Sequence, residues 1–140
     1  MHVEIVSDLA QLKALQPDWE KLWSEDPHAD VFATFEWFLI WWEHFGHGES
    51  PAALVTHEGP ELAAVPGGGW QLRVCVVRDD TGQITAILPL VLVHGVFESM
   101  RSRILATPIN SHAPRSGVIA GRHGTNAIPA LCKALIGMGG

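Results

Sequence analysis

The sequence predicts a mixed α/β domain of the α+β class, and the order of its segments is the reason. Two segments near the start carry apolar residues at helical spacing, a series of β-rich segments follows, and a final helical segment comes last. Helices and strands are therefore segregated, unlike in a repeating βαβ array. The chain has 140 residues, the usual size of one domain, so we expect residues 1–140 to form a single unit.

The first 25 residues predict a strand followed by a helix. His2–Val6 alternates in the manner of a short strand, and Asp8 can cap the helix that follows. Pro17 should kink or restart this helix. The apolar positions of the helix are Leu9, Leu12, Leu15, Trp19, Leu22 and Trp23.

Residues 34–46, TFEWFLIWWEHFG, predict a second helix rich in aromatic side chains. Thr34 can cap it, Glu36 lies in its favourable first turn, and Gly46 or Gly48 can end it. We interpret the segment as a core-facing helix whose indole N–H groups find partners at the edge of the core. The side chains that share its buried side are Phe38, Trp41, Trp42 and Phe45.

Residues 47–69 are rich in Gly, Pro and Ala, and we expect a long loop or insertion there. Residues 70–77 and 83–93 are β-rich and are joined by RDDTG, so they predict a β-hairpin. Pro89 cannot donate to a ladder, which indicates a bulge, an edge or a strand end.

Two further strands are expected at Arg103–Thr107 and Gly117–Ala120. A last helix, capped by Asn126 or Thr125, should carry its apolar positions at Ile128, Leu131, Leu135 and Ile136, with Pro129 tolerated in its first turn. Because the sequence stops directly after this apolar helix, we expect an incomplete domain.

Composition argues against several classes of function. The net charge is −6 and no basic run occurs, so binding to nucleic acid or to anionic lipid is not expected. The longest apolar stretch, Ala86–Val93, is far shorter than the roughly 20 residues that span a bilayer. Cys75 and Cys132 lie far apart in apolar segments, which is typical of reduced core residues and of a cytoplasmic protein.

The loop NSHAPRS between two expected strands carries the most reactive polar side chains. His112 could act as a general base and Arg115 could hold an anion. Asn110 and Ser111, together with Trp37 as a stacking surface, are the candidate substrate-binding residues. The alternative is an ordinary polar loop whose side chains satisfy its own backbone.

Two other stretches resemble sites only in part. Glu43, His44 and His47 have the spacing of metal ligands, but a further ligand at a definite place is missing, so we predict no metal site. The loop 121–126 precedes a helix N-terminus, a geometry that can hold phosphate, but it matches neither the P-loop nor the dinucleotide fingerprint. No cofactor-binding residue is predicted.

Four stretches taken in order resemble a known family: LQPDWEKLW, VFATFEWFLIWWEHFG, LRVCVVRDDTGQITAILPLVL and SRILATPINSHAPRSGVIAG. Together they resemble the N-terminal half of the cellulose-biosynthesis acetyltransferase-like family, the CelD/BcsL type of the GNAT superfamily. The resemblance covers most of the chain. It implies a GNAT-like fold, with two N-terminal helices packed on an antiparallel-rich sheet and a C-terminal helix.

The resemblance also implies an N-acyltransferase that uses acetyl-CoA or another acyl-CoA, with a small-molecule or glycan-precursor acceptor in exopolysaccharide, cellulose or cell-envelope biosynthesis. In that family a [QR]-x-x-G-x-[GA] loop in the C-terminal part holds the cofactor, and no such loop occurs here. We therefore expect no acyl-CoA binding and no activity from this chain alone. The resemblance transfers no catalytic residue.

Two other hypotheses stay open. One is a non-catalytic interaction module that docks through its aromatic helix and an unfinished sheet edge, either by self-association or onto a missing C-terminal half. The other is a small standalone enzyme that uses His112 and Arg115.

Overall fold

A computed structural model describes residues 2–46, 63–64, 71–97, 100–106, 118–121 and 127–138. A first strand is followed by helical elements, then by the other strands and then by a last helix, which confirms the mixed α+β class. The helical elements are α1 (Leu9–Ala14), α2 (Gln16–Glu25), η1 (Val31–Ala33), α3 (Phe35–Trp41), the π-type turn η2 (Trp42–Gly46) and α4 (Ile128–Met138). The strands are β1 (His2–Val6), β2 (Ala63–Ala64), β3 (Gln71–Leu72), β4 (Val74–Arg78), β5 (Ile84–Leu88), β6 (Val91–Phe97), β7 (Met100–Ala106) and β8 (Ile119–Ala120).

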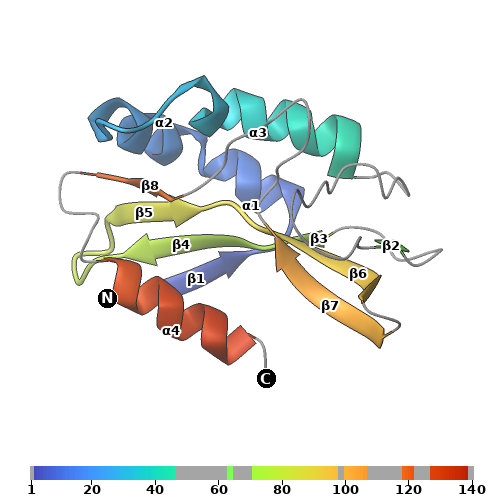
Figure 1. The fold of residues 1–140 in the computed structure, drawn as a ribbon. Helices are drawn as coiled ribbons and strands as arrows, with labels where there is room; N and C mark the ends of the chain where they lie inside the picture. Colours follow the sequence, from blue (N-terminus) through green and yellow to red (C-terminus); the bar gives the residue numbers. More distant parts are fainter. Residues whose placement is uncertain are drawn as a thin grey trace.

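One antiparallel sheet lies between two helical layers. Its strand order is β1-β4-β5-β8, and every neighbouring pair is antiparallel. Helices α1, α2 and α3 cover one face, and α4 lies against the other (Figure 1). Strands β6 and β7 pair with each other and extend away from this sheet, and β2 and β3 pair with β6.

The expected hairpin is present, and it links the two sheets. Leu72 pairs with Val91 and Cys75 pairs with Leu88, so both strands advance by the same number of residues between the two pairs. The Arg73 amide donates to the carbonyl of Leu90 at 2.9 Å within the break. Strands β3 and β4 therefore form one long strand of the hairpin, and β5 and β6 form the other.

Three details of the strands differ from expectation or refine it. Pro89 marks a strand end, because β5 stops at Leu88 and β6 begins at Val91. Within the expected loop or insertion at 47–69, Ala63–Ala64 form the short strand β2, which was not predicted. Strand β7 begins at Met100, earlier than the expected Arg103, because it pairs along the whole of β6.

Side chains alternate between the two faces of the sheet, as the pleat requires. Val74 and Val76 of β4 belong to the cluster under α1 to α3, whereas Cys75 and Val77 belong to the cluster under α4. The register shift between Val77 and Arg78 places an extra residue on β5 and forms a bulge beside the turn.

Helices α1 and α2 are two pieces of the predicted first helix. Asp8 caps α1, since its carboxylate accepts from the Gln11 amide at 2.7 Å, and Pro17 lies at the start of α2, which confirms the predicted restart. Trp19 is fully buried, and its indole N–H donates to the carbonyl of Ala33 at 2.9 Å. Trp23, another apolar position of this helix, is 37% exposed.

Helix α3 confirms the core-facing interpretation of the aromatic segment. The hydroxyl of Thr34 accepts from the Trp37 amide at 3.3 Å and caps the helix. Phe38 lies stacked against Trp19, with ring centroids 5.5 Å apart. Phe35, Phe38, Trp41 and Trp42 are buried, and the side chain of Phe45 lies outside the described residues.

Helix α4 lies where it was predicted, but only some of its apolar positions are buried. Leu131 is buried against the sheet, whereas Ile128 and Ile136 are 48% and 80% exposed. Cys132 is a free thiol on this exposed side, so its expected place in the core was wrong. A helix packed on a sheet through one narrow stripe leaves the remaining apolar positions in solvent. The candidate caps Thr125 and Asn126 lie outside the described residues.

None of the described helices is long and apolar enough to span a bilayer.

Candidate functional site: a pocket between β1 and helices α1 and α2

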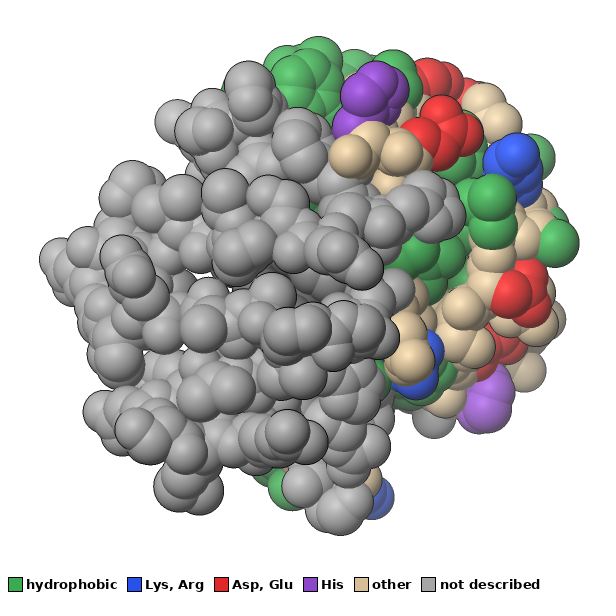
Figure 2. Space-filling model, turned by 90° about the vertical axis from the view of Figure 1, so that its right-hand side faces the viewer, with side chains coloured by type: hydrophobic (Ala, Val, Ile, Leu, Met, Phe, Trp, Pro, Cys, Tyr) green, Lys and Arg blue, Asp and Glu red, His purple; other side chains and the backbone are tan. Residues whose placement is uncertain are grey.

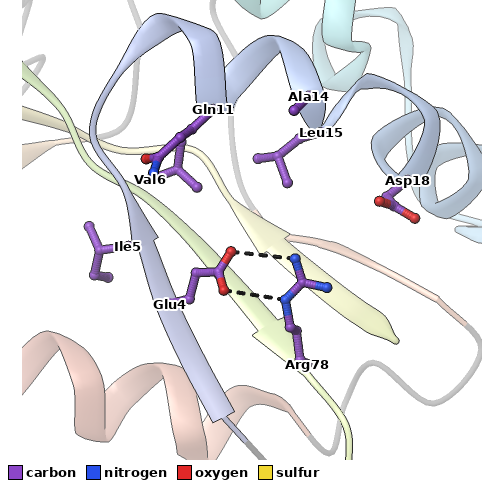
Figure 3. A pocket seen from close by; sticks show the side chains of 8 residues that line it. All are labelled: Glu4, Ile5, Val6, Gln11, Ala14, Leu15, Asp18 and Arg78. Atoms are coloured by element: carbon purple, nitrogen blue, oxygen red, sulfur yellow. Dashed lines mark hydrogen bonds and ion pairs between the residues drawn. The ribbon is translucent and has the colours of Figure 1, made fainter. Parts of the chain in front are cut away.

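A pocket of about 220 Å³ opens between strand β1 and helices α1 and α2 (Figure 3). Its buried side is apolar and is formed by Val6 and Leu15, whose side chains are 3% and 5% exposed. Polar and charged side chains from four elements, β1, β4, α1 and α2, surround this apolar side. The lining residues are Glu4, Ile5, Val6, Gln11, Ala14, Leu15, Asp18 and Arg78.

An ion pair between two strands forms one wall of the pocket. Glu4 of β1 and Arg78 of β4 point toward each other on the face that carries α1 and α2 (Figure 3). The guanidinium donates to both carboxylate oxygens, from Nε to Oε2 at 3.3 Å and from Nη2 to Oε1 at 3.4 Å. Its Nη1 donates to the carbonyl of Gly82 at 2.9 Å. Each nitrogen of Arg78 thus has a partner in the protein.

The turn beside Arg78 holds that carbonyl in place. The Asp79 carboxylate accepts from the amides of Thr81 and Gln83 at 2.9 and 3.0 Å and from the Thr81 hydroxyl at 2.6 Å. The hydroxyl of Thr81 and then the backbone amides lower the pKa of Asp79 below its usual range. Gly82 has φ +87°, a conformation that favours glycine, and it lets the turn close.

The opposite side of the pocket comes from the helices. Gln11 of α1 and Asp18 of α2 are exposed, while Leu15 between them is buried against the sheet. Asp18 lies in the first turn of α2, where a negative charge is favourable. Within the described part of the chain, no hydrogen bond or ion pair engages the side chain of Gln11 or of Asp18.

The pocket therefore combines an apolar floor with one unpaired carboxylate. Glu4 and Arg78 compensate each other, so the charge of Asp18 is left over. The arrangement can receive a small ligand that carries a hydrogen-bond donor or a positive charge. It brings together no nucleophile and base.

Trp37, the described candidate among the predicted substrate-binding residues, does not line this pocket. Its ring packs edge-on against Phe32, with centroids 4.9 Å apart, and it is half-buried. Its indole N–H is buried and finds no hydrogen-bond partner among the described residues. The expectation that indole N–H groups find partners thus holds for Trp19 and Trp23, whose N–H groups donate to carbonyl oxygens, but not here.

The candidate residues Asn110, Ser111, His112 and Arg115 lie outside the described residues. Their predicted roles in substrate binding and catalysis stay predictions.

The backbone amides at the start of the glycine-bearing loop at 121–126 already donate hydrogen bonds to other parts of the protein. The Ala120 amide donates to the Asp26 carboxylate at 3.0 Å, and the Gly121 amide donates to the carbonyl of Thr85 at 3.1 Å. Neither amide is available to a phosphate. The rest of this loop, residues 122–126, lies outside the described residues.

His44 completes no metal site within the described residues. One ring nitrogen lies 2.9 Å from the carbonyl oxygen of Ile40, one helical turn earlier. Glu43 is exposed, and His47 lies outside the described residues. Across the described ranges no group of three His, Cys, Asp or Glu side chains could hold a metal ion. On the face that Figure 2 draws, histidine and acidic side chains lie beside hydrophobic ones in the described part of the chain.

Cys75 lies in the middle of β4 and is fully buried, which confirms its predicted packing role. Burial raises the pKa of its thiol to about 11, so it stays protonated at neutral pH and is a poor nucleophile.

Sequence reasoning missed the pocket. Glu4 and Arg78 are 74 residues apart, and only the pairing of β1 with β4 brings them together. A local signal existed, since Glu4 interrupts an apolar strand on the same face as Val6. That signal carries no information on the partner strand.

Comparison of the chain with protein-family models, characterised proteins and solved structures finds no match to any of them.

Proposed function

We propose that this chain is the N-terminal, GNAT-like region of an acyl-CoA-dependent N-acyltransferase, of the acetyltransferase type, and that it shapes the acceptor side of the active site. The observation that carries the proposal is the ordered set of aromatic helix, D-x-x-G hairpin and AILPL strand. The aromatic side chains of α3 share one cluster with β4 and β5 of this hairpin, so these segments form one packed unit.

The proposed chemistry requires an amine held beside an acyl thioester. The amine nitrogen attacks the thioester carbonyl, the carbon–sulfur bond breaks, the amine loses a proton and the CoA thiol leaves. The family resemblance assigns acyl-CoA binding to a loop that this sequence does not contain. The acceptor would be a small molecule or a glycan precursor of exopolysaccharide, cellulose or cell-envelope synthesis, and the location would be the cytoplasm.

The test begins with the DNA beyond the last codon, which should continue into a [QR]-x-x-G-x-[GA] loop. The protein encoded by the longer frame should release CoA thiol from acetyl-CoA in the presence of an amine, measured with a thiol-reactive dye. Calorimetric titration of acetyl-CoA into the present chain should show no binding. Binding of acetyl-CoA to the present chain with micromolar affinity would contradict the proposal that the cofactor-binding part lies outside this chain. A longer protein that releases no thiol with any of a panel of amines would contradict the proposed activity.

A second candidate function is a non-catalytic interaction module, and one observation favours it. Ile128, Cys132 and Ile136 recur every four residues along α4 and are exposed, which places an apolar stripe on its outer side. Size-exclusion chromatography with light scattering tests self-association. A monodisperse monomer at high concentration would count against it, and so would an Ile136→Lys variant that elutes like the unmodified chain.

A further inference from the structure

We infer that the pocket between β1 and helices α1 and α2 binds the ammonium end of a small alkylamine, with Asp18 as its charge partner. The inference rests on the proposed function for its purpose, since an amine is the acceptor of an N-acyltransferase. The binding itself follows from the pocket.

The charges of the lining select a cation. The guanidinium of Arg78 donates hydrogen bonds to both carboxylate oxygens of Glu4 and to the carbonyl of Gly82. An anion in the pocket would compete with Glu4 for Arg78 and would lie beside the negative charge of Asp18. An ammonium group instead meets the carboxylate of Asp18, which no described residue engages.

The floor and the volume select the rest of the ligand. Val6 and Leu15 provide apolar surface beneath the polar rim, and Ala14 also lines the pocket. A volume of about 220 Å³ is smaller than the roughly 300–1,000 Å³ of sites that enclose a drug-sized molecule. The pocket thus suits a chain of a few carbons that ends in ammonium, or the corresponding end of a larger acceptor. Each methylene that becomes buried should tighten binding about threefold to fourfold.

The experiment titrates n-butylammonium chloride into the ¹⁵N-labelled chain at constant ionic strength and follows amide shifts by NMR. Saturable shifts are expected at the amides of β1, α1 and the first turn of α2. n-Butanol has a similar shape without the charge and should bind more weakly, while butyrate should not shift these amides. Saturable shifts with butyrate at the same amides would overturn the inference, and so would the absence of saturable shifts with butylammonium.

An Asp18→Asn variant keeps the shape of the side chain and removes its charge. Because Asp18 is exposed and solvent screens it, we expect binding to weaken about threefold to fivefold. Glu36→Gln is the matched control, since it removes one exposed carboxylate that does not line the pocket, and it should leave the affinity unchanged. Equal weakening in the two variants would show an effect of net charge alone and would overturn the site.

This experiment needs no acyl donor, so its outcome is separate from that of the acyl-transfer assay. Amine binding without transfer by the longer protein would contradict the proposed function and leave the site standing. Transfer without amine binding at these residues would contradict the site and leave the function standing.

Discussion

Replacement of Trp19 by Phe tests whether its buried indole links the helical layer together. Trp19 is fully buried, contacts Phe35 and Phe38 through its ring, and donates to the carbonyl of Ala33 at 2.9 Å. The substitution keeps an aromatic ring on the helix but removes the donor and part of the ring volume. Two losses follow, and each can be sized.

The carbonyl of Ala33 loses its described side-chain donor in a part-buried position, which costs about 1–2 kcal/mol. A void of roughly 40 Å³, at about 24 cal/mol per Å³, adds about 1 kcal/mol. We therefore expect Trp19→Phe to lower the free energy of unfolding by about 2–3 kcal/mol. Urea unfolding followed by far-UV circular dichroism measures this quantity.

Trp23→Phe is the matched control. The Trp23 indole also donates to a carbonyl, that of Asp30 at 2.8 Å, but the side chain is 37% exposed. Water can replace that donor and fill the space, so the loss should stay under about 1 kcal/mol. Equal losses in the two variants would refute the argument that burial sets the cost.

Three further predictions concern other parts of the fold. A Cβ at Gly121 would lie 3.3 Å from the side-chain ends of Leu22 and Glu25, so Gly121→Ala should lower the free energy of unfolding, measured in urea, by up to about 1 kcal/mol. A Cβ at Gly137 on α4 meets nothing within 4 Å, so Gly137→Ala should raise it by about 0.5–1 kcal/mol. The reverse order would contradict the packing of β8 on α2. The lowered pKa of Asp79 stabilises the fold above the unfolded carboxyl pKa of about 3.9, and this effect is lost as the pH falls through the folded value. The wild type should therefore lose its advantage over Asp79→Asn in urea melts as the pH falls below about 4, and a difference independent of pH would argue against the turn. At pH 8 a thiol reagent should modify one cysteine, Cys132, in the native protein and both after unfolding, because Cys75 is buried and protonated; two fast thiols in the native state would contradict its position.

Local signals predicted the helix starts and the hairpin. The caps at Asp8 and Thr34 act within three residues, and the hairpin turn uses its own side chains, so no distant segment is needed to specify them. Strand β1 was also placed correctly, because its alternation is visible within five residues.

Which apolar helix positions are buried could not be predicted, because this depends on the shape of the packing partner. Helical periodicity marks Trp23 on α2, and Ile128 and Ile136 on α4, as apolar positions. The width of the stripe that each helix buries depends on the sheet against which it packs. Cys132 follows the same rule on α4. The pocket could not be predicted, since its charged wall depends on a strand pairing between residues 74 positions apart.

The turn at residues 79–82 influences the strand register in both sheets, because both contain strands of the same hairpin. Because the hairpin keeps a single register from the pair Val77–Ala86 to the pair Gln71–Leu92, the turn and the bulge beside it together determine which side chains point toward the aromatic helices and which toward α4. A slip of one residue at that turn would exchange the two sides along the entire ribbon. The register of β6 on β3 therefore depends on the turn at residues 79–82 and on the adjoining bulge, both of which lie outside β6.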